Sequence, residues 1–156
     1  MVYPSPLPPA DIEAVAWLSA VDVIRDYCGW HIAPEFEETV TLDGPGGPVL
    51  ILPTRKVKAI ASITNDGHLV SDPEWSSDGL VRGGWTGRFR GVVVTMTHGF
   101  SQWPAELESL VRDMLAAADR GGVKAVTSRS HQVAFESVMS EANISKLEKY
   151  RLRAEP

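Results

Sequence analysis

The sequence predicts an α+β protein in which helices pack with an inserted antiparallel β meander and a short helix closes the chain. Three observations predict this class. Apolar residues recur at helical spacing near both ends, they alternate with polar residues in the middle, and Gly, Asn and Asp turns separate the alternating segments. Because helices and strands are segregated, a parallel doubly wound sheet is not expected. A chain of 156 residues with 44% apolar content suits a single compact core.

The first helix is expected over residues 11–28, with Asp11 as its cap and Gly29 as the left-handed residue that ends it. Four prolines within residues 1–9 predict that residues 1–10 form a flexible arm. The apolar stripe of this helix is expected to comprise Ile12, Val15, Ala16, Leu18, Ser19, Val21, Val23 and Ile24.

Several strands are expected between residues 36 and 97. A strand begins at Phe36, with Val40 and Leu42 on the same side, and the turn cluster 43–47 leads into the apolar run 49–52, which predicts a hairpin. A second hairpin joins 56–64 to 68–70 through Asn65-Asp66-Gly67. A further turn lies at residues 78–79, and the β-branched segment 92–97 is expected to be a central strand.

The last third of the chain predicts two helices and one extended segment. The clearest amphipathic helix starts at Pro104 and ends at Gly121-Gly122, and the polar stretch 124–137 reads as extended, with Val133 and Phe135 as its large apolar residues. A short helix capped by Ser140 is expected over about 140–152. The expected division is therefore an arm (1–10), a core domain (11–139) and a terminal helix with its tail (140–156). The residues expected on the buried side of the long helix are Leu107, Leu110, Val111, Met114, Leu115 and Ala118.

Composition restricts the possible functions. Lys and Arg total 15 against 20 Asp and Glu, a formal net charge of −5, which argues against tight nucleic-acid binding. Cys28 is the single cysteine, so no internal disulfide forms and assembly in a reducing cytoplasm is expected. No apolar run approaches the roughly 18 residues that cross a bilayer, and no secretory signal opens the chain. We expect no membrane association.

Candidate chemical motifs are weak. Cys28 and His31 could form a thiol nucleophile or half of a zinc site, but zinc needs about four ligands, so a buried thiol at a helix end is favoured. The glycine cluster 44–47 lacks a Gly-Lys-Ser/Thr ending and is interpreted as a hairpin tip. The carboxylates Glu35, Glu37 and Glu38 are interpreted as a solvent-facing side rather than an acid/base pair. We expect neither catalysis nor a cofactor.

Two segments point to macromolecular contacts. Arg82, Arg88 and Arg90 alternate with aromatic residues and glycine, a pattern that fits either single-stranded nucleic acid or, more consistently with the net charge, an acidic protein surface. The terminal helix has apolar anchors and a basic side, and it either packs on its own core or docks on a partner. The basic side comprises Lys146, Lys149, Arg151 and Arg153.

Several stretches taken together resemble head-to-tail connector (adaptor) proteins of actinobacterial siphophages. The similarity spans nearly the whole chain, in residues 26–34, 38–47, 50–54, 72–79, 97–100, 104–107 and 149–152. The resemblance implies a structural virion protein of the neck, assembled in the host cytoplasm as a ring of about twelve copies, a dodecamer. Such a ring lies under the portal protein, extends the channel for genomic DNA without binding it specifically, and contacts head-closure (stopper) or tail proteins.

The resemblance also implies candidate contact residues. Residues 140–156 are expected to dock on the portal, and the loops near Gly44 and Gly84, with the 124–137 segment, to contact neighbouring subunits or the tail. The alternatives, a nucleic-acid-binding module or a small-molecule enzyme, have no motif in support. The portal-docking candidates are Ile144, Leu147, Lys149, Tyr150, Arg151 and Leu152. The inter-subunit or tail-contact candidates are Arg82, Trp85, Arg88, Phe89, Val133 and Phe135.

Overall fold

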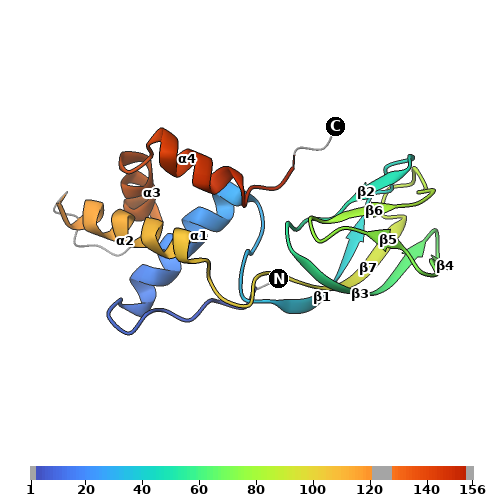
Figure 1. Cartoon of the computed structure of the whole chain (residues 1–156), viewed down its shortest axis with the longest axis horizontal. Helices are drawn as coiled ribbons and strands as arrows, with labels where there is room; N and C mark the ends of the chain where they lie inside the picture. Colours follow the sequence, from blue (N-terminus) through green and yellow to red (C-terminus); the bar gives the residue numbers. More distant parts are fainter. Residues whose placement is uncertain (1–2, 121–127, 154–156) are drawn as a thin grey trace. The chain divides into compact units, whose positions relative to one another are not determined.

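The computed structural model describes residues 3–120 and 128–153, and the chain divides into two compact units (Figure 1). The helical unit combines the segment up to Pro34 with the segment from Gln102 to Leu152. The β unit comprises Glu35–Ser101 together with Arg153, and is thus inserted into the sequence of the helical unit. The α+β class, the antiparallel strands and the short C-terminal helix are confirmed.

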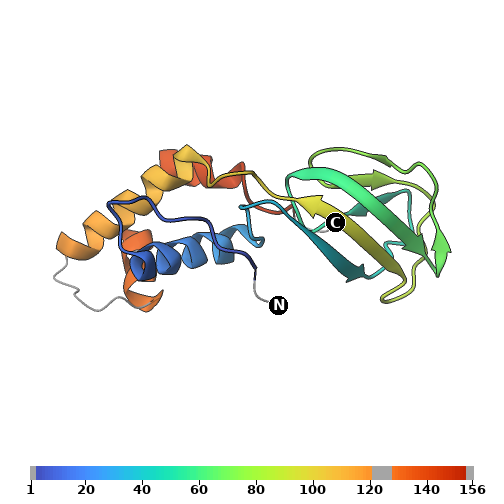
Figure 2. The same ribbon diagram turned by 90° about the horizontal axis from the view of Figure 1, so that it is seen from below.

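Four helices make up the described part of the helical unit: α1 (Ala14–Cys28), α2 (Ala105–Arg120), α3 (Ser128–Ser137) and α4 (Glu141–Glu148). Helices α1, α2 and α3 pack against one another, and α4 packs on α2. The N-terminal residues run beside α1, where the Trp17 indole donates a hydrogen bond of 3.0 Å to the Pro6 carbonyl (Figure 2). Trp17 also meets Trp103 edge to face, which gives the core its aromatic centre.

Helix α1 ends as expected but starts later. Gly29 adopts φ 84° and terminates the helix, which confirms the predicted end. The predicted Asp11 cap is wrong: the helix begins at Ala14, and the Asp11 carboxylate binds Arg112 instead. The predicted apolar stripe is also partly wrong, since Val15 is 54% exposed and Trp17 is buried. Apolar residues surround most of this helix, so packing against α2 and α3 decides which side is buried.

Helix α2 matches its prediction, with Leu107, Leu110, Val111 and Met114 buried. Residues 121–127, which include the expected stop signal at Gly121-Gly122, lie outside the described residues. The extended conformation predicted for 124–137 is wrong for its described part, because Ser128–Ser137 is α3. His131, Ala134 and Phe135 are buried at helical spacing. Three buried residues among many polar ones are too few to predict a helix from the sequence. Contacts with α1 and α2 stabilise α3.

Helix α4 begins where its cap predicts. The Ser140 hydroxyl accepts a hydrogen bond of 3.3 Å from the backbone N–H of Asn143, which confirms the Ser140 cap. The helix ends at Glu148, earlier than the predicted residue 152. Residues 149–152 continue along the helical unit, and the Leu152 N–H donates to the Cys28 carbonyl at 2.8 Å.

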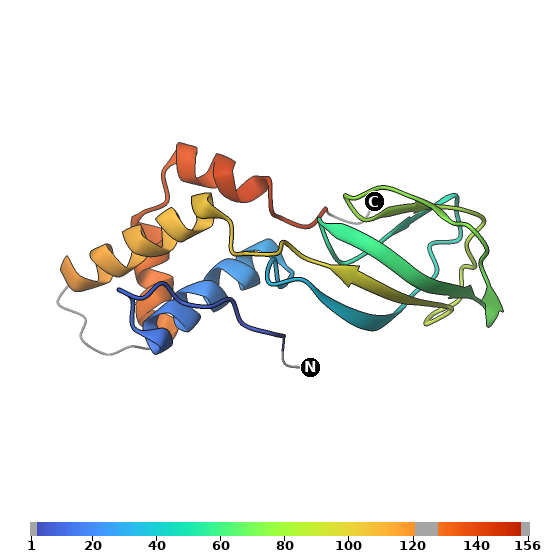
Figure 3. The same ribbon diagram turned by 60° about the horizontal axis from the view of Figure 1, so that its bottom comes forward.

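Two antiparallel sheets form the β unit. The four-stranded sheet has the order β1-β7-β3-β4 and the three-stranded sheet the order β2-β6-β5 (Figure 3). The two sheets share one apolar core, to which Leu50 and Val81 come from the smaller sheet and Ile63, Val94 and Met96 from the larger. The strands are β1 (Phe36–Leu42), β2 (Val49–Ile51), β3 (Val57–Asn65), β4 (His68–Leu69), β5 (Glu74–Trp75), β6 (Leu80–Arg82) and β7 (Val92–His98).

The strand pairing departs from a simple meander. The β3–β4 hairpin, the turn between β5 and β6 and the central place of β7 are confirmed. The hairpin predicted across residues 43–47 is wrong, because β1 pairs with β7 and β2 pairs with β6 in the other sheet. Both pairings join residues far apart in sequence, and a local turn pattern carries no signal for them.

Candidate functional site

Three loops of the β unit are hydrogen-bonded together, and we call residues 43–48, 65–67 and 83–91 the loop cluster. The Gly44 N–H donates to the Arg88 carbonyl, and the Gly46 N–H to the Thr86 carbonyl, each at 2.9 Å. The Asn65 amide joins the third loop by donating to the Gly84 carbonyl at 2.9 Å. The glycine cluster is therefore no hairpin tip. Its backbone instead lies beside the Gly84 loop, so the two predicted contact loops form one surface.

The loop cluster presents an apolar side chain between cations. Phe89 is 86% exposed, and the Arg88 side chain is 79% exposed, with its nearest described carboxylate, that of Asp66, 3.9 Å away. Arg90 is exposed as well. An aromatic ring flanked by guanidinium groups suits an acidic, partly aromatic protein surface.

Other predicted loop residues have different roles. Trp85 is only 6% exposed and its indole donates to the Val81 carbonyl at 3.1 Å, so it belongs to the core of the β unit. Arg82 is exposed and pairs with Glu74 at 3.0 Å.

The predicted contact pair Val133 and Phe135 lies on α3 in the helical unit. Val133 is 57% exposed and faces solvent. Phe135 is buried, with its ring 5.6 Å from that of Tyr27. Only Val133 of this pair is thus available for a contact.

The predicted docking helix packs on its own unit. Leu147 is fully buried, whereas Ile144 is 39% exposed. Lys149 pairs with Glu106 of α2 at 3.3 Å. The first alternative, a helix packed on its own core, therefore holds for the buried side of α4. Its exposed side remains available for a partner.

The segment after α4 is fixed to α1. The Arg151 guanidinium lies over the Tyr27 ring at 5.2 Å and pairs with Glu148 at 3.2 Å. The Tyr150 carbonyl accepts a hydrogen bond from the Trp30 indole. With the bond from Leu152 to Cys28, these contacts hold residues 149–152 in place.

Cys28 is a buried thiol at the end of α1, which is the interpretation favoured from its sequence context. Its Sγ lies 4.0 Å from the Leu147 carbonyl. Burial raises the pKa of Cys28 to about 12, which favours the protonated thiol at neutral pH. His31 bonds to the Pro34 carbonyl through Nε2 at 3.0 Å. Within residues 3–120 and 128–153, no three His, Cys, Asp or Glu side chains gather as a metal site.

Glu38 and His98 form a buried pair that was not predicted. Glu38 Oε1 lies 3.1 Å from His98 Nε2, and both side chains are buried, so the expectation that Glu38 faces solvent is wrong. The alternation of β1 carries the missed signal, because Glu38 lies between Phe36 and Val40 on one side of the strand. Burial raises the pKa of Glu38 and lowers the pKa of His98 to about 4.

An open groove runs along α1, and we call it the α1 groove. Its volume is about 610 Å³. Arg25 is one of its lining residues and donates to the carbonyls of Pro4, His31 and Ala33 at 2.6 to 2.8 Å. No sequence motif marks this groove, because its walls come from the N-terminal residues, α1 and the loop after it. The lining residues used in the further inference are Tyr3, Asp22, Arg25, Asp26, Trp30 and His31.

No helix in the described part of the chain combines the length and apolar character needed to cross a membrane.

Comparison with known proteins gives matches at the level of structure. No family model and no curated protein matches the sequence. A chain from the neck of a native GTA (gene transfer agent) particle, computed with C12 symmetry, superposes with a TM-score of 0.55 at 16% identity over 92% of this chain and 85% of its own. A chain from the neck of an empty GTA particle, computed with C6 symmetry, gives a TM-score of 0.51 at 15% identity over 96% and 84%. The protein therefore has the fold of a neck protein of a phage-like particle.

Proposed function

We propose that this chain is a structural head-to-tail connector (adaptor) subunit of a tailed-phage neck, and that it catalyses no reaction. The main support is the similarity in fold to GTA neck chains, which covers 92% of this chain and therefore includes both units. The protonated thiol of Cys28 agrees with a structural role. The resemblance to actinobacterial siphophage connectors supports the more specific family and a place between the portal and the head-closure or tail proteins.

The proposed assembly is a ring of twelve copies. The neck chains that resemble this chain come from GTA particles whose necks were computed with C12 and C6 symmetry, which supports a cyclic assembly here. Each subunit of a ring must offer one face to a different face of its neighbour. A net charge of −5 also suits a DNA channel, because a strongly cationic lining would retain the polyanion.

We place portal docking within residues 140–156, on the exposed side of the described residues 140–153. Ile144, Lys149 and Arg151 are exposed and offer an apolar and cationic contact. Leu147 and Leu152 hold this segment on the helical unit and support those residues from beneath. The loop cluster and Val133 are the proposed surfaces toward neighbouring subunits, the head-closure protein or the tail.

Mass photometry and negative-stain microscopy of the full chain, alone at high concentration and mixed with its portal ring, test the proposed ring. We expect a particle of about twelve chains that stacks on the portal, in keeping with closed cyclic symmetry. A chain that stays monomeric at tens of micromolar with the portal present would contradict the proposal.

Substitution tests the docking surface better than deletion, since removing residues 140–156 would also remove the buried Leu147. The variant Ile144→Asp with Lys149→Glu should lose portal binding in a pull-down by tenfold or more, because both changes oppose the proposed contact. Val15→Asp with Arg129→Glu makes the same changes at exposed positions of α1 and α3 and is the matched control. Equal portal binding by all these proteins would place docking elsewhere.

A further inference from the structure

The α1 groove is lined by two carboxylates and by a single guanidinium group, that of Arg25. Asp22 and Asp26 lie one turn apart on α1, and within the described residues neither belongs to an ion pair. Arg25, the nearest cation on the helix, directs its guanidinium to three backbone carbonyls. Asp26 also lies in the last turn of α1, where the helix dipole disfavours a negative charge. Asp22 attracts the Arg25 guanidinium, so the groove keeps an excess of one carboxylate over its cation.

Aromatic rings line the same groove. Tyr3 is 40% exposed and stacks on the His31 ring with centroids 5.6 Å apart. Trp30 meets His31 edge to face at the same separation, and the Trp30 indole is held by the Tyr150 carbonyl. A volume of about 610 Å³ falls within the range of about 300–1,000 Å³ that accommodates small ligands and anchoring side chains. Acidic walls beside aromatic rings suit guanidinium groups together with an aromatic ring.

The loop cluster has the complementary chemistry. Arg88, Phe89 and Arg90 are consecutive and exposed, and hydrogen bonds within the β unit hold the loop that carries them. The Arg88 carbonyl accepts from the Gly44 N–H at 2.9 Å, and the Arg90 N–H donates to the Asp43 carboxylate at 2.8 Å. A loop that is ordered in advance loses little conformational entropy when it binds.

We propose that Arg88, Phe89 and Arg90 of one subunit bind in the α1 groove of the neighbouring copy. The inference rests on the proposed ring, and it assigns the two unlike faces that a head-to-tail ring requires. The two arginines pair with Asp22 and Asp26, and Phe89 packs among the groove aromatics. The occupant is a second copy because one chain carries both the acidic groove and the cationic loop, on different units.

Charge reversal tests this contact. The groove variant carries Asp22→Lys and Asp26→Lys, and the loop variant carries Arg88→Glu and Arg90→Glu. Each variant alone sets like charges against each other at every contact, so half-assembly should need at least tenfold more protein than wild type. Mixed in equal amounts, the two variants should form alternating rings, because each loop then meets a groove of opposite charge. Mass photometry measures the size of the assemblies formed by wild type, by each variant and by the mixture.

Controls separate folding from assembly. Asp113→Lys with Asp119→Lys makes the same charge change on exposed positions of α2 and should assemble like wild type. Thermal unfolding confirms that each variant folds. If reversal lowers the Tm, the neutral variants Asp22→Asn with Asp26→Asn and Arg88→Ser with Arg90→Ser replace it, with a smaller expected loss of assembly.

The outcomes distinguish the contact from the ring. Single variants that assemble like wild type, or a mixture that fails to recover rings, would overturn the contact while the ring stands. Loop variants that form rings but lose a tail or head-closure protein would assign the loop to that partner and overturn the contact too. A wild-type chain that forms no ring would instead remove the proposed function.

Discussion

The two units of this chain reach a stable core by different routes. The β unit is formed almost entirely by the continuous stretch 35–101, with two sheets that share one core. The helical unit joins segments from the two ends of the described chain, such as Tyr27 with Glu148 at 3.0 Å. The helical unit therefore depends on contacts between distant segments, and closing them carries a larger entropic cost.

The units also differ in what they leave for partners. Folding of the helical unit uses much of the predicted docking segment, since Leu147 is buried and residues 149–152 bond to α1 and its following loop. The β unit instead exposes Arg88 and Phe89 on ordered loops. A surface-exposed apolar residue on a well-held loop is thus the stronger indicator of a contact than an amphipathic pattern at a chain end.

The largest expected effect concerns the attachment of α4. Leu147→Ala removes a fully buried side chain and should lower the free energy of unfolding by about 2–5 kcal/mol. Ile144→Ala, at a position 39% exposed on the same helix, should cost much less. Urea denaturation followed by circular dichroism measures both. Similar losses for the two variants would mean that α4 is not anchored through Leu147.

The buried pair of the β unit predicts a pH effect of intermediate size. The pKa of His98 is lowered to about 4 from 6.5, so between these values the unfolded chain binds a proton that the folded unit does not. Stability should therefore fall as the pH falls through this window, by up to about 3 kcal/mol. The pKa of Glu38 is raised, so above pH 4.5 the folded unit keeps a proton that the unfolded chain has lost. This contribution lowers stability as the pH rises, opposite to that of His98.

Urea midpoints between pH 4 and 7 check the sign. His98→Asn should flatten the dependence, whereas His68→Asn, at an exposed histidine of the same unit, should keep it. An unchanged slope in the His98 variant would assign the pH dependence to other groups.

A smaller loss is expected where the loop cluster is tightest. A Cβ on residue 44 would lie 2.0 Å from the Thr86 carbonyl oxygen, so Gly44→Ala must displace backbone. We expect a loss of about 1–3 kcal/mol in the unfolding of the β unit, together with weaker ring assembly if the loop is a contact. Gly47→Ala, with no atom within 4 Å of its Cβ, should change stability by less than about 0.5 kcal/mol. Tryptophan fluorescence during denaturation measures both.

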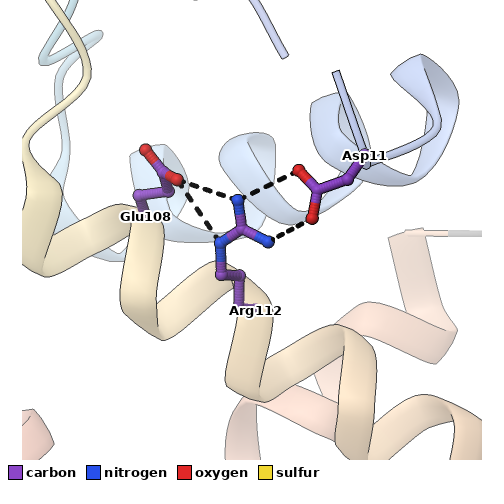
Figure 4. Close-up of polar contacts among 3 residues, drawn as sticks. All are labelled: Asp11, Glu108 and Arg112. Carbon is purple, nitrogen blue, oxygen red and sulfur yellow. Dashed lines mark hydrogen bonds and ion pairs between the residues drawn. The ribbon is translucent and has the colours of Figure 1, made fainter. Parts of the chain in front are cut away.

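The smallest effect belongs to the exposed ion pair that fixes the start of the helical unit. Arg112 binds Asp11 through two nitrogens, at 2.7 and 3.1 Å, and also Glu108 (Figure 4). The hydrogen bonds from Arg112 lower the pKa of Asp11, so the stability from this pair is present above the unfolded value of 3.8 and is lost as the pH falls through the folded value.

The variant Asp11→Asn should therefore have a slightly lower Tm at pH 7, because the pair is exposed and screened, and the difference should vanish in acid. Asp113→Asn on the same unit is the control. A difference that persists in acid strong enough to protonate Asp11 would show that the carboxylate charge is not its source.

One part of the candidate site, the loop cluster, was predictable from the sequence, and the α1 groove was not. The pattern of arginines and aromatics around Gly84 predicted a contact loop, and Phe89 is indeed exposed. The same pattern could not predict that Trp85 is buried while Phe89 is exposed. Which aromatic residue of the loop joins the core depends on residues from other strands that pack around it. The α1 groove gave no signal at all, because Tyr3, Asp22 and Trp30 come from segments that only folding brings together.

Local chemistry in the sequence by itself determined the α+β class, the end of α1 at Gly29, the Ser140 cap and the turn at Asp66-Gly67. The last three depend on backbone conformations or hydrogen bonds within a few residues, which residue type dictates directly. The class depends on the spacing of apolar residues along each segment. Only the tertiary structure decided that residues 128–137 form a helix, that β1 pairs with β7 and that Glu38 meets His98. These features depend on partners distant in sequence, whose packing outweighs the small free energies of local preference.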